Sequence, residues 1–403
     1  NRITAASTQI DVKTAKAALF PSLSFSTSQQ VVNRPYQETS SRVSGSEIIS
    51  SNSKTSYNGN YGLNVSWTLY NGNKRLKTIQ QEKLNNQVAE LDVATSENNI
   101  QESIAQVYIQ ILYAAESVKV NESTLQVSIA QRDRGQELLN AGSIAKSDFA
   151  QLEAQVSTDR YQLVTAQATL EDYKLQLKQL LELDGENEMN IYLPALSDEN
   201  VLAPLPTKKD VYISALSLRP EIEASKLNVE ASELGIGIAK SSYLPTISLS
   251  AGIGTNHTSG SDFTFGEQVK NGWNNSIGLS VSVPIFNNRQ TKSAVQKAKL
   301  QYETSMLSLL DEQKTLYKTI EGLWLDANSA QQRYAAANEK LKSTQISYEL
   351  ISEQFNLGMK NTIELLTEKN NLLQAQQEQL QAKYMAILNT QLLKFYQGDQ
   401  LAL

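Results

Sequence analysis

Two stretches of this chain carry helical patterns that are too long for a compact domain. They run from about Lys74 to about Leu139 and from about Gln290 to about Phe355, and neither contains a proline. Apolar residues recur in them at steps of three and four, which is typical of a narrow coiled-coil stripe. At 1.5 Å per residue, roughly 65 residues span ~100 Å. The chain is therefore expected to build long coiled coils.

Each long helix is expected to turn back on itself at a glycine. Gly142 lies in "NAGSIAK" and Gly358 lies in "NLGMKN". A second helix of about 35–40 residues follows each turn, so both pairs are expected to form antiparallel helical hairpins.

The whole pattern occurs twice. "GLNVSWTLYNG" from Gly62 corresponds to "GLSVSVPIFNN" from Gly278, and the same spacing relates Gly142 to Gly358. Upstream, "AKAALFPSLSFS" matches "AKSSYLPTISLS". The chain is therefore two copies of one long unit and not a solenoid of short repeats.

Each copy carries two segments that alternate between apolar and polar residues, the pattern of a strand with one wet face. In "GLNVSWTLYNG", one face carries Leu63, Val65, Trp67 and Leu69. The other face carries Asn64, Ser66, Thr68 and Tyr70. In the second copy, the returning strand is expected to place on one face Ile277, Leu279, Val281, Val283 and Ile285. Polar loops at about 32–58 and 255–275 separate the strands of each copy.

Composition excludes several classes of protein. The formal net charge of −6 does not predict a nucleic-acid partner. Cysteine is absent, which excludes disulfides and thiolate metal sites. The one histidine, His257, lies in a polar loop, and no metal motif, cofactor motif or catalytic constellation is found. No apolar run reaches the length of a membrane-spanning helix. We therefore expect no enzyme, no metal and no cofactor.

The apolar strand faces leave two alternatives. They could face each other in a small β-sandwich, as in a soluble periplasmic coiled-coil scaffold or interaction protein. They could instead face lipid, where an unpaired strand edge costs several kcal/mol per group. Four strands cannot close a barrel, because about eight are needed. The second alternative therefore requires assembly with copies of the same chain.

These motifs together resemble the TolC family of outer-membrane efflux ducts. "AKAALFPSLSFS" and "AKSSYLPTISLS" resemble the family's passage from helix to barrel, "LRPEIEASKLNVEAS" its segment between the repeats, and "QFNLGMKNTIELLTEKNNLLQAQ" its tip hairpin. The resemblance implies an α+β membrane protein: a trimeric 12-stranded β-barrel with four strands per chain, continued by a long α-helical coiled-coil barrel with a small mixed equatorial region. The chain starts inside a helical pattern, so a leader and part of the first helix are expected before Asn1.

The resemblance also implies a function and partners. The chain is expected to be a passive export duct, the exit channel of a tripartite efflux or secretion system. Its expected partners are two further copies (a homotrimer), a periplasmic adaptor (membrane fusion) protein, an inner-membrane RND, ABC or MFS pump, and the lipid bilayer, with no nucleic acid. It is expected in the outer membrane of a Gram-negative bacterium, extending through the periplasm.

The expected regions follow the repeat. They are a helix entering the barrel (1–20), a first β-hairpin (21–70) with external loop 32–58, a long helix with its tip hairpin helix (71–182), an equatorial connector (183–218), a helix (219–243), a second β-hairpin (244–287) with external loop 255–275, a second long helix with its tip hairpin helix (288–396) and a C-terminal tail (397–403).

The tips of the helical hairpins carry the candidate gate. By resemblance, Glu364 matches a constriction ring, Lys360 matches a basic latch, and Ser147 and Asp148 match gate positions of the neighbouring helix. Thr367 stands where the family often has a second acid, and it shares a helix face with Glu364. Three-fold symmetry would bring three Glu364 carboxylates near one axis, which favours cations. The alternative is that Asn361 and Glu364 form a helix capping box.

Two further groups complete the candidates. An adaptor-docking tip is expected at Gly142, Ser143, Phe355, Leu357, Gly358 and Met359, with simple hairpin packing as the alternative. Membrane-interface anchors are expected at Tyr61, Trp67 and Tyr70, although Trp67 could simply face lipid.

Overall fold

The computed structural model describes residues 1–36, 40–44, 47–51, 54–183, 191–192, 201–261 and 263–401. Parts of the predicted loops 32–58 and 255–275, of the connector 183–218 and of the tail 397–403 lie outside these residues. The chain divides into two compact units. The first joins Asn1–Leu91 to Ala224–Leu309, and the second joins Asp92–Glu223 to Leu310–Leu403. The division falls inside the long helices, whereas the predicted boundaries follow the ends of elements.

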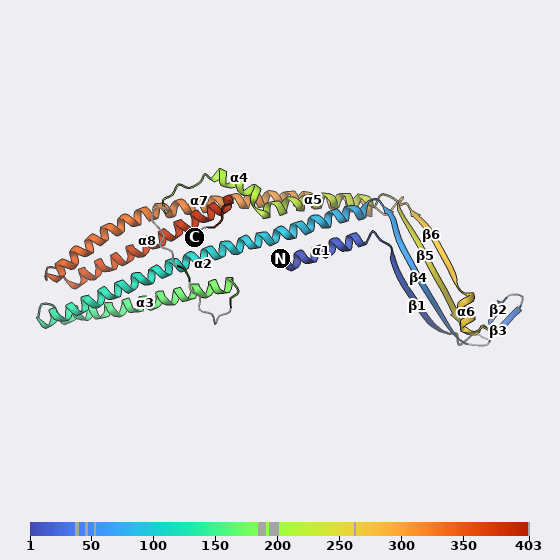
Figure 1. The fold of residues 1–403 in the computed structure, drawn as a ribbon, viewed down its shortest axis with the longest axis horizontal. Helices are drawn as coiled ribbons and strands as arrows, with labels where there is room; N and C mark the ends of the chain where they lie inside the picture. Colours follow the sequence, from blue (N-terminus) through green and yellow to red (C-terminus); the bar gives the residue numbers. More distant parts are fainter. Residues whose placement is uncertain are drawn as a thin grey trace. The chain divides into compact units, whose positions relative to one another are not determined.

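The first unit contains one antiparallel sheet of four strands (Figure 1). Its order is β1 (Ser22–Asn33), β4 (Thr55–Asn71), β5 (Thr246–Thr258) and β6 (Asn274–Ser282). A separate two-stranded ribbon joins β2 (Ser40–Ser44) to β3 (Glu47–Ser51). Among the described residues, the four predicted strands therefore lie side by side in one sheet, and the alternative of two facing sheets is wrong.

The sheet keeps apolar residues in register across all four strands. Leu23 pairs with Val65, Val65 with Ala251, and Ala251 with Ile277. The adjacent row of paired residues, which points to the opposite face, runs through Ser24, Asn64, Gly252 and Ser276. Successive residues of a strand point to opposite faces, so the sheet has one apolar and one polar face, as predicted. The apolar face is exposed in the single chain; Leu279, for example, is 64% exposed.

Two details of the strands differ from the prediction. A β-bulge between Thr68 and Tyr70 brings Tyr70 opposite Ile247, which belongs to the apolar face. An extra residue in one strand shifts the alternation, so the assignment of Tyr70 to the polar face is wrong. In addition, β6 ends at Ser282. Val283 and Ile285 therefore lie beyond the strand, where Pro284 has no N–H to donate to a ladder.

Described parts of both predicted loops form regular secondary structure. β4 begins at Thr55 and β5 continues to Thr258, inside the expected loops. The second loop contains a short helix, α6 (Phe265–Asn271). A capping box between Thr264 and Glu267 lies at its start. Glu267 accepts from the Thr264 N–H at 2.8 Å, and the Thr264 hydroxyl accepts from the Glu267 N–H at 3.4 Å.

Besides α6, the helices of this unit are α1 (Arg2–Ala17), most of α5 (Pro220–Ser241), and the first parts of α2 (Lys74–Asn140) and α7 (Gln290–Asn356). Both long helices begin after two residues with positive φ: Gly72 and Asn73 before α2, and Asn288 and Arg289 before α7. The two copies thus use the same kind of backbone turn from strand to helix.

The second unit contains the rest of α2 and α7 with α3 (Lys146–Leu180), α4 (Lys208–Leu218) and α8 (Thr362–Gln397). Its core joins Val211 and Ala215 of α4 to Ile320 of α7 and Leu393 of α8. The two long helices and the two shorter partners that follow them are confirmed, with limits within about one residue of the prediction for α2 and α7. In the part of the chain that is described, none of the helices combines the length and apolar character needed to cross a membrane.

Candidate functional site

The two helical hairpins turn through the same backbone motif. Gly142 and Gly358 both have φ of 72°. The N–H of Ser143 donates to the Leu138 carbonyl at 2.8 Å, and the N–H of Met359 donates to the Gln354 carbonyl at 2.8 Å. These bonds reach back five residues, as in the glycine C-cap that satisfies the last carbonyls of a helix. The repeated sequence therefore builds two equivalent tips.

Glu364 caps the first turn of α8. Its Oε2 accepts from the Asn361 N–H at 3.2 Å, while Asn361 Oδ1 accepts from the Glu364 N–H at 2.9 Å. The predicted capping box is confirmed. Lys360 Nζ donates to Glu364 Oε1 at 2.5 Å. The hydrogen bond from Lys360, followed by the one from Asn361, lowers the pKa of Glu364. The side chain is 41% exposed, so it is an accessible and ionised carboxylate.

The other gate candidates make local contacts within the described chain. Thr367 donates its hydroxyl to the Ile363 carbonyl at 2.7 Å. Asp148 accepts from the Ala145 N–H at 3.4 Å at the start of α3. Ser147 is exposed. Lys360 contacts Glu364 of its own segment, four residues further along the chain.

The tip residues divide into packed and exposed side chains. Phe355 is 3% exposed and packs with Leu152 of α3 and Leu365 of α8. Its burial agrees with the alternative of hairpin packing. Leu357 and Met359, by contrast, are 75% and 71% exposed. Gly142, Ser143 and Gly358 are also exposed. An exposed apolar pair thus lies on the α7–α8 turn.

A buried ion pair lies further along α3 and α8, away from the turns. Lys369 of α8 donates to the carboxylate of Asp159 on α3 and to the hydroxyl of Ser128 on α2. Ser128 also donates to Asp159. Burial lowers the pKa of Lys369, and the bond to Asp159 opposes that shift only in part. We did not predict this cluster, because its members are far apart in the sequence and each resembles an ordinary polar residue of a helix.

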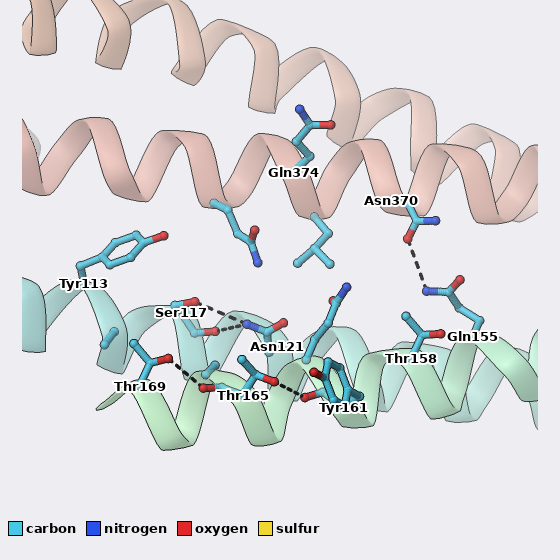
Figure 2. A pocket seen from close by; sticks show the side chains of 15 residues that line it. Tyr113, Ser117, Asn121, Gln155, Thr158, Tyr161, Thr165, Thr169, Asn370 and Gln374 are labelled. Atoms are coloured by element: carbon cyan, nitrogen blue, oxygen red, sulfur yellow. Dashed lines mark hydrogen bonds between the residues drawn. The ribbon is translucent and has the colours of Figure 1, made fainter. Parts of the chain in front are cut away.

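A polar groove of about 620 Å³ adjoins the ion pair, between α2, α3 and α8 (Figure 2). Its lining contains no Asp, Glu, Lys or Arg and is rich in amides and hydroxyls. Gln155 of α3 donates across it to Asn370 of α8 at 3.4 Å, and Asn121 of α2 donates to the Ser117 carbonyl at 2.7 Å. Such a surface is suited to water or to neutral polar groups.

The three predicted anchors are held in different ways. Trp67 donates its indole N–H to the Leu19 carbonyl at 2.8 Å, so it ties β4 to the end of the first helical segment. Tyr61 stacks on His257, with ring centroids 5.8 Å apart. Tyr70 lies at the bulge, half-buried.

Arg219 is a second buried charge that the sequence did not single out. It donates to Glu221 at 2.8 Å and to Glu102 of α2 at 3.3 Å. Its guanidinium carbon lies 4.2 Å from the ring centroid of Tyr396 on α8. Burial, followed by the charge of Glu102, raises the pKa of Tyr396 to about 12. This cluster joins the start of α5 to α2 and α8.

Comparison with known proteins places this architecture among outer-membrane proteins. The family model described as "Outer membrane efflux protein" matches residues 2–182 and 211–398. The outer membrane efflux protein BepC of Brucella suis is 23% identical over 332 residues, which are 82% of this chain and 70% of that protein. The outer membrane protein TolC of Escherichia coli is 23% identical over 324 residues, 78% of this chain and 64% of TolC.

Solved structures share the fold at lower identity. The structure of CusC, described as forming a transmembrane channel, has a TM-score of 0.82 at 18% identity and covers 99% of this chain and 88% of that chain. The outer membrane channel CmeC of Campylobacter jejuni has a TM-score of 0.78 at 18% identity, over 100% of this chain and 83% of that chain.

Proposed function

Because this chain belongs to the outer membrane efflux protein family, we propose that it is a passive export duct of the Gram-negative outer membrane. It serves as the exit channel of a tripartite efflux or secretion system. A periplasmic adaptor protein and an inner-membrane RND, ABC or MFS pump supply the other two parts and the driving force. The duct itself performs no chemistry.

One observation carries this proposal: the exposed apolar face that is in register across all four strands. Rows such as Leu23, Val65, Ala251 and Ile277 place apolar side chains opposite one another from edge to edge. Burying them against lipid removes apolar area from water. The opposite face, with Ser and Asn side chains, then lines a watery lumen.

The sheet edges support assembly with copies. In the described sheet, β1 and β6 are the edge strands. Lipid does not satisfy the free N–H and C=O groups of such edges. Pairing β6 of one copy with β1 of the next removes them, and three copies give a barrel of 12 strands. Each 67-residue helix spans ~100 Å at 1.5 Å per residue, which suits a tunnel through the periplasm.

Glu364 is the residue that we assign to the gate. In a three-fold assembly its exposed carboxylates approach one axis and attract cations. The capping role does not compete with this one, because the cap holds the carboxylate in place. Lys360, which contacts Glu364 within its own chain, is assigned as a latch between neighbouring helices, and Thr367, Asp148 and Ser147 are assigned to the same gate region.

The exposed turn is the surface that we assign to the adaptor. Leu357 and Met359 present apolar side chains beside Gly358, and Gly142 with Ser143 forms the equivalent turn of the other hairpin. Phe355 is left out of this surface because it is buried. Tyr61, Trp67 and Tyr70 are assigned to the membrane boundary.

Membrane fractionation tests the proposal. The chain is expressed with a cleavable secretion signal, and the outer membrane is separated from periplasmic and inner-membrane fractions. We expect the chain in the outer membrane, released only by detergent, with a mass of three protein chains of 44.6 kDa each. A water-soluble monomer in the periplasm would contradict the proposal.

A further inference from the structure

Three helices of the second unit meet at one buried polar cluster. Lys369 of α8 and Asp159 of α3 form an ion pair with side chains 3% and 1% exposed. Ser128 of α2, also buried, bonds to both of them. The Oδ1 of Asp159 accepts a further bond from Gln155 at 2.9 Å. The cluster thus ties the α2–α3 hairpin to α8.

These groups occupy positions that apolar residues normally fill. On α3, Asp159 follows the buried Leu152 and Val156, at helical steps of four and three. On α8, Lys369 lies between the buried Leu365 and Leu372. Replacing a buried ion pair with apolar residues is often neutral or stabilising. Stability alone therefore gives no reason for charges at these positions.

The amides and hydroxyls of the neighbouring groove do not by themselves select one alignment of α3 and α8. Along α3, the groove is lined by Gln155, Gln162 and Thr169, which follow one another at intervals of seven residues. An amide both donates and accepts, so Asn370 of α8 would find a similar partner after a slip of one heptad. A polar residue at a single seam position is a known means of fixing the register of a coiled coil.

We propose that the Lys369–Asp159 pair fixes the register of the two helical hairpins, that is, the axial alignment of α8 against α2 and α3. Lys369 and Asp159 are positioning residues: they set the level of Glu364 relative to Asp148. A slip of one heptad would move α8 by ~10 Å. It would also leave Lys369 and Asp159 buried without each other, which is costly. The consequence for the gate rests on the proposed function, whereas the alignment itself does not.

Cross-linking measures the alignment directly, because the chain has no cysteine of its own. Cysteines replace Gln155 and Asn370, whose amides are 3.4 Å apart, and a short bis-maleimide joins them. A second pair at Gln162 and Asn370 reports a slip of one heptad. A third pair at Lys340 and Glu378, which form a 2.7 Å ion pair between α7 and α8, reports that this hairpin is folded. Each pair is placed in the full chain with and without D159L/K369L.

D159L/K369L removes the ion pair and places apolar side chains at both buried positions. We expect cross-linking of Gln155→Cys with Asn370→Cys to fall at least fivefold. Cross-linking of Gln162→Cys with Asn370→Cys should rise, and the Lys340→Cys and Glu378→Cys pair should be unchanged. Unaltered cross-linking of the first pair in D159L/K369L would overturn the proposal. Loss of all three cross-links would also overturn it, because the pair would then be needed for folding and not for register. Cross-linking does not depend on conduction. The proposed alignment can therefore be confirmed even if the chain is not an export duct.

Discussion

Lys360 donates a 2.5 Å hydrogen bond to Glu364, and the same carboxylate caps α8 through Asn361. The gate candidate is therefore held by residues of its own chain. Its charge and its capping role can be separated by mutation, because an amide accepts the same backbone bond.

E364Q removes the charge and retains an oxygen for the Asn361 N–H. We expect the preference of the pore for cations over anions to fall several-fold, since three carboxylates are removed from the axis. The unfolding temperature should fall only slightly, because the lost ion pair with Lys360 is partly exposed. Reversal potentials in a salt gradient measure the preference. N361A is the matched control: it removes the cap and should cost about 1 kcal/mol of stability while cation preference remains. Unchanged preference in E364Q would remove Glu364 from the gate.

The ionisation of Glu364 predicts a pH dependence. Lys360 and Asn361 lower its pKa below the ordinary value of 4.5. A carboxyl with a lowered pKa in the folded state stabilises fully above its unfolded pKa, and this contribution is lost as pH falls through the folded pKa. Cation preference depends on the charged carboxylate, so it should be constant near neutral pH and should be lost only below 4.5, the ordinary pKa of the group.

K360M tests the cause of this shift. Without the ammonium, the midpoint of the pH titration of cation preference should move upward. A wild-type midpoint above 4.5 would contradict the prediction, because repulsion among the three carboxylates would then outweigh Lys360.

The two faces of β6 can be compared at adjacent residues. Leu279 lies in the apolar row with Leu249, and Ser280 lies opposite Ser248 on the polar face. L279R should reduce the amount of folded assembly in the outer membrane, because Arg at the lipid midplane costs about 2–4 kcal/mol. S280R should assemble normally and change conductance. Equal recovery of both variants from the outer membrane would show that the apolar face does not meet lipid.

Alanine substitutions at two glycines distinguish the cost of backbone strain from the cost of a steric clash. Gly142 has φ of 72°, and a Cβ there would meet nothing within 4 Å. G142A should therefore cost only the left-handed conformation, about 1–2 kcal/mol. Gly72 has φ of 67°, and a Cβ there would lie 2.7 Å from the Ser241 carbonyl oxygen. G72A should lower the unfolding temperature more than G142A does; an equal effect would contradict the close packing at Gly72.

Local patterns predicted most of the fold. Period-two alternation identified strands such as the one through Leu63 and Val65, and the turn glycines identified the hairpin tips. The short helix α6 was missed, although Thr264 and Glu267 carry the Thr-x-x-Glu spacing of a capping box that could have revealed it. The bulge at Tyr70 could not be predicted, because register depends on the partner strand.

The candidate site was less accessible from sequence. The Asn361–Glu364 box is local and was predicted. The contact between Lys369 and Asp159 joins residues on different hairpins, and one sequence contains no signal for such a pairing. Burial distinguishes them from the many solvated charges of the same helices, and burial is a property of the assembled structure.

Electrical recording from a planar lipid bilayer tests the central claim most directly. The purified, detergent-extracted assembly is added to one side of the membrane under a fixed voltage. We predict stepwise increases in current from long-lived, cation-preferring pores, with no added energy source, and weaker cation preference in E364Q. An assembly that binds to the bilayer but leaves its resistance unchanged, over a range of voltages and salt concentrations, would contradict the assignment of this chain as an export duct.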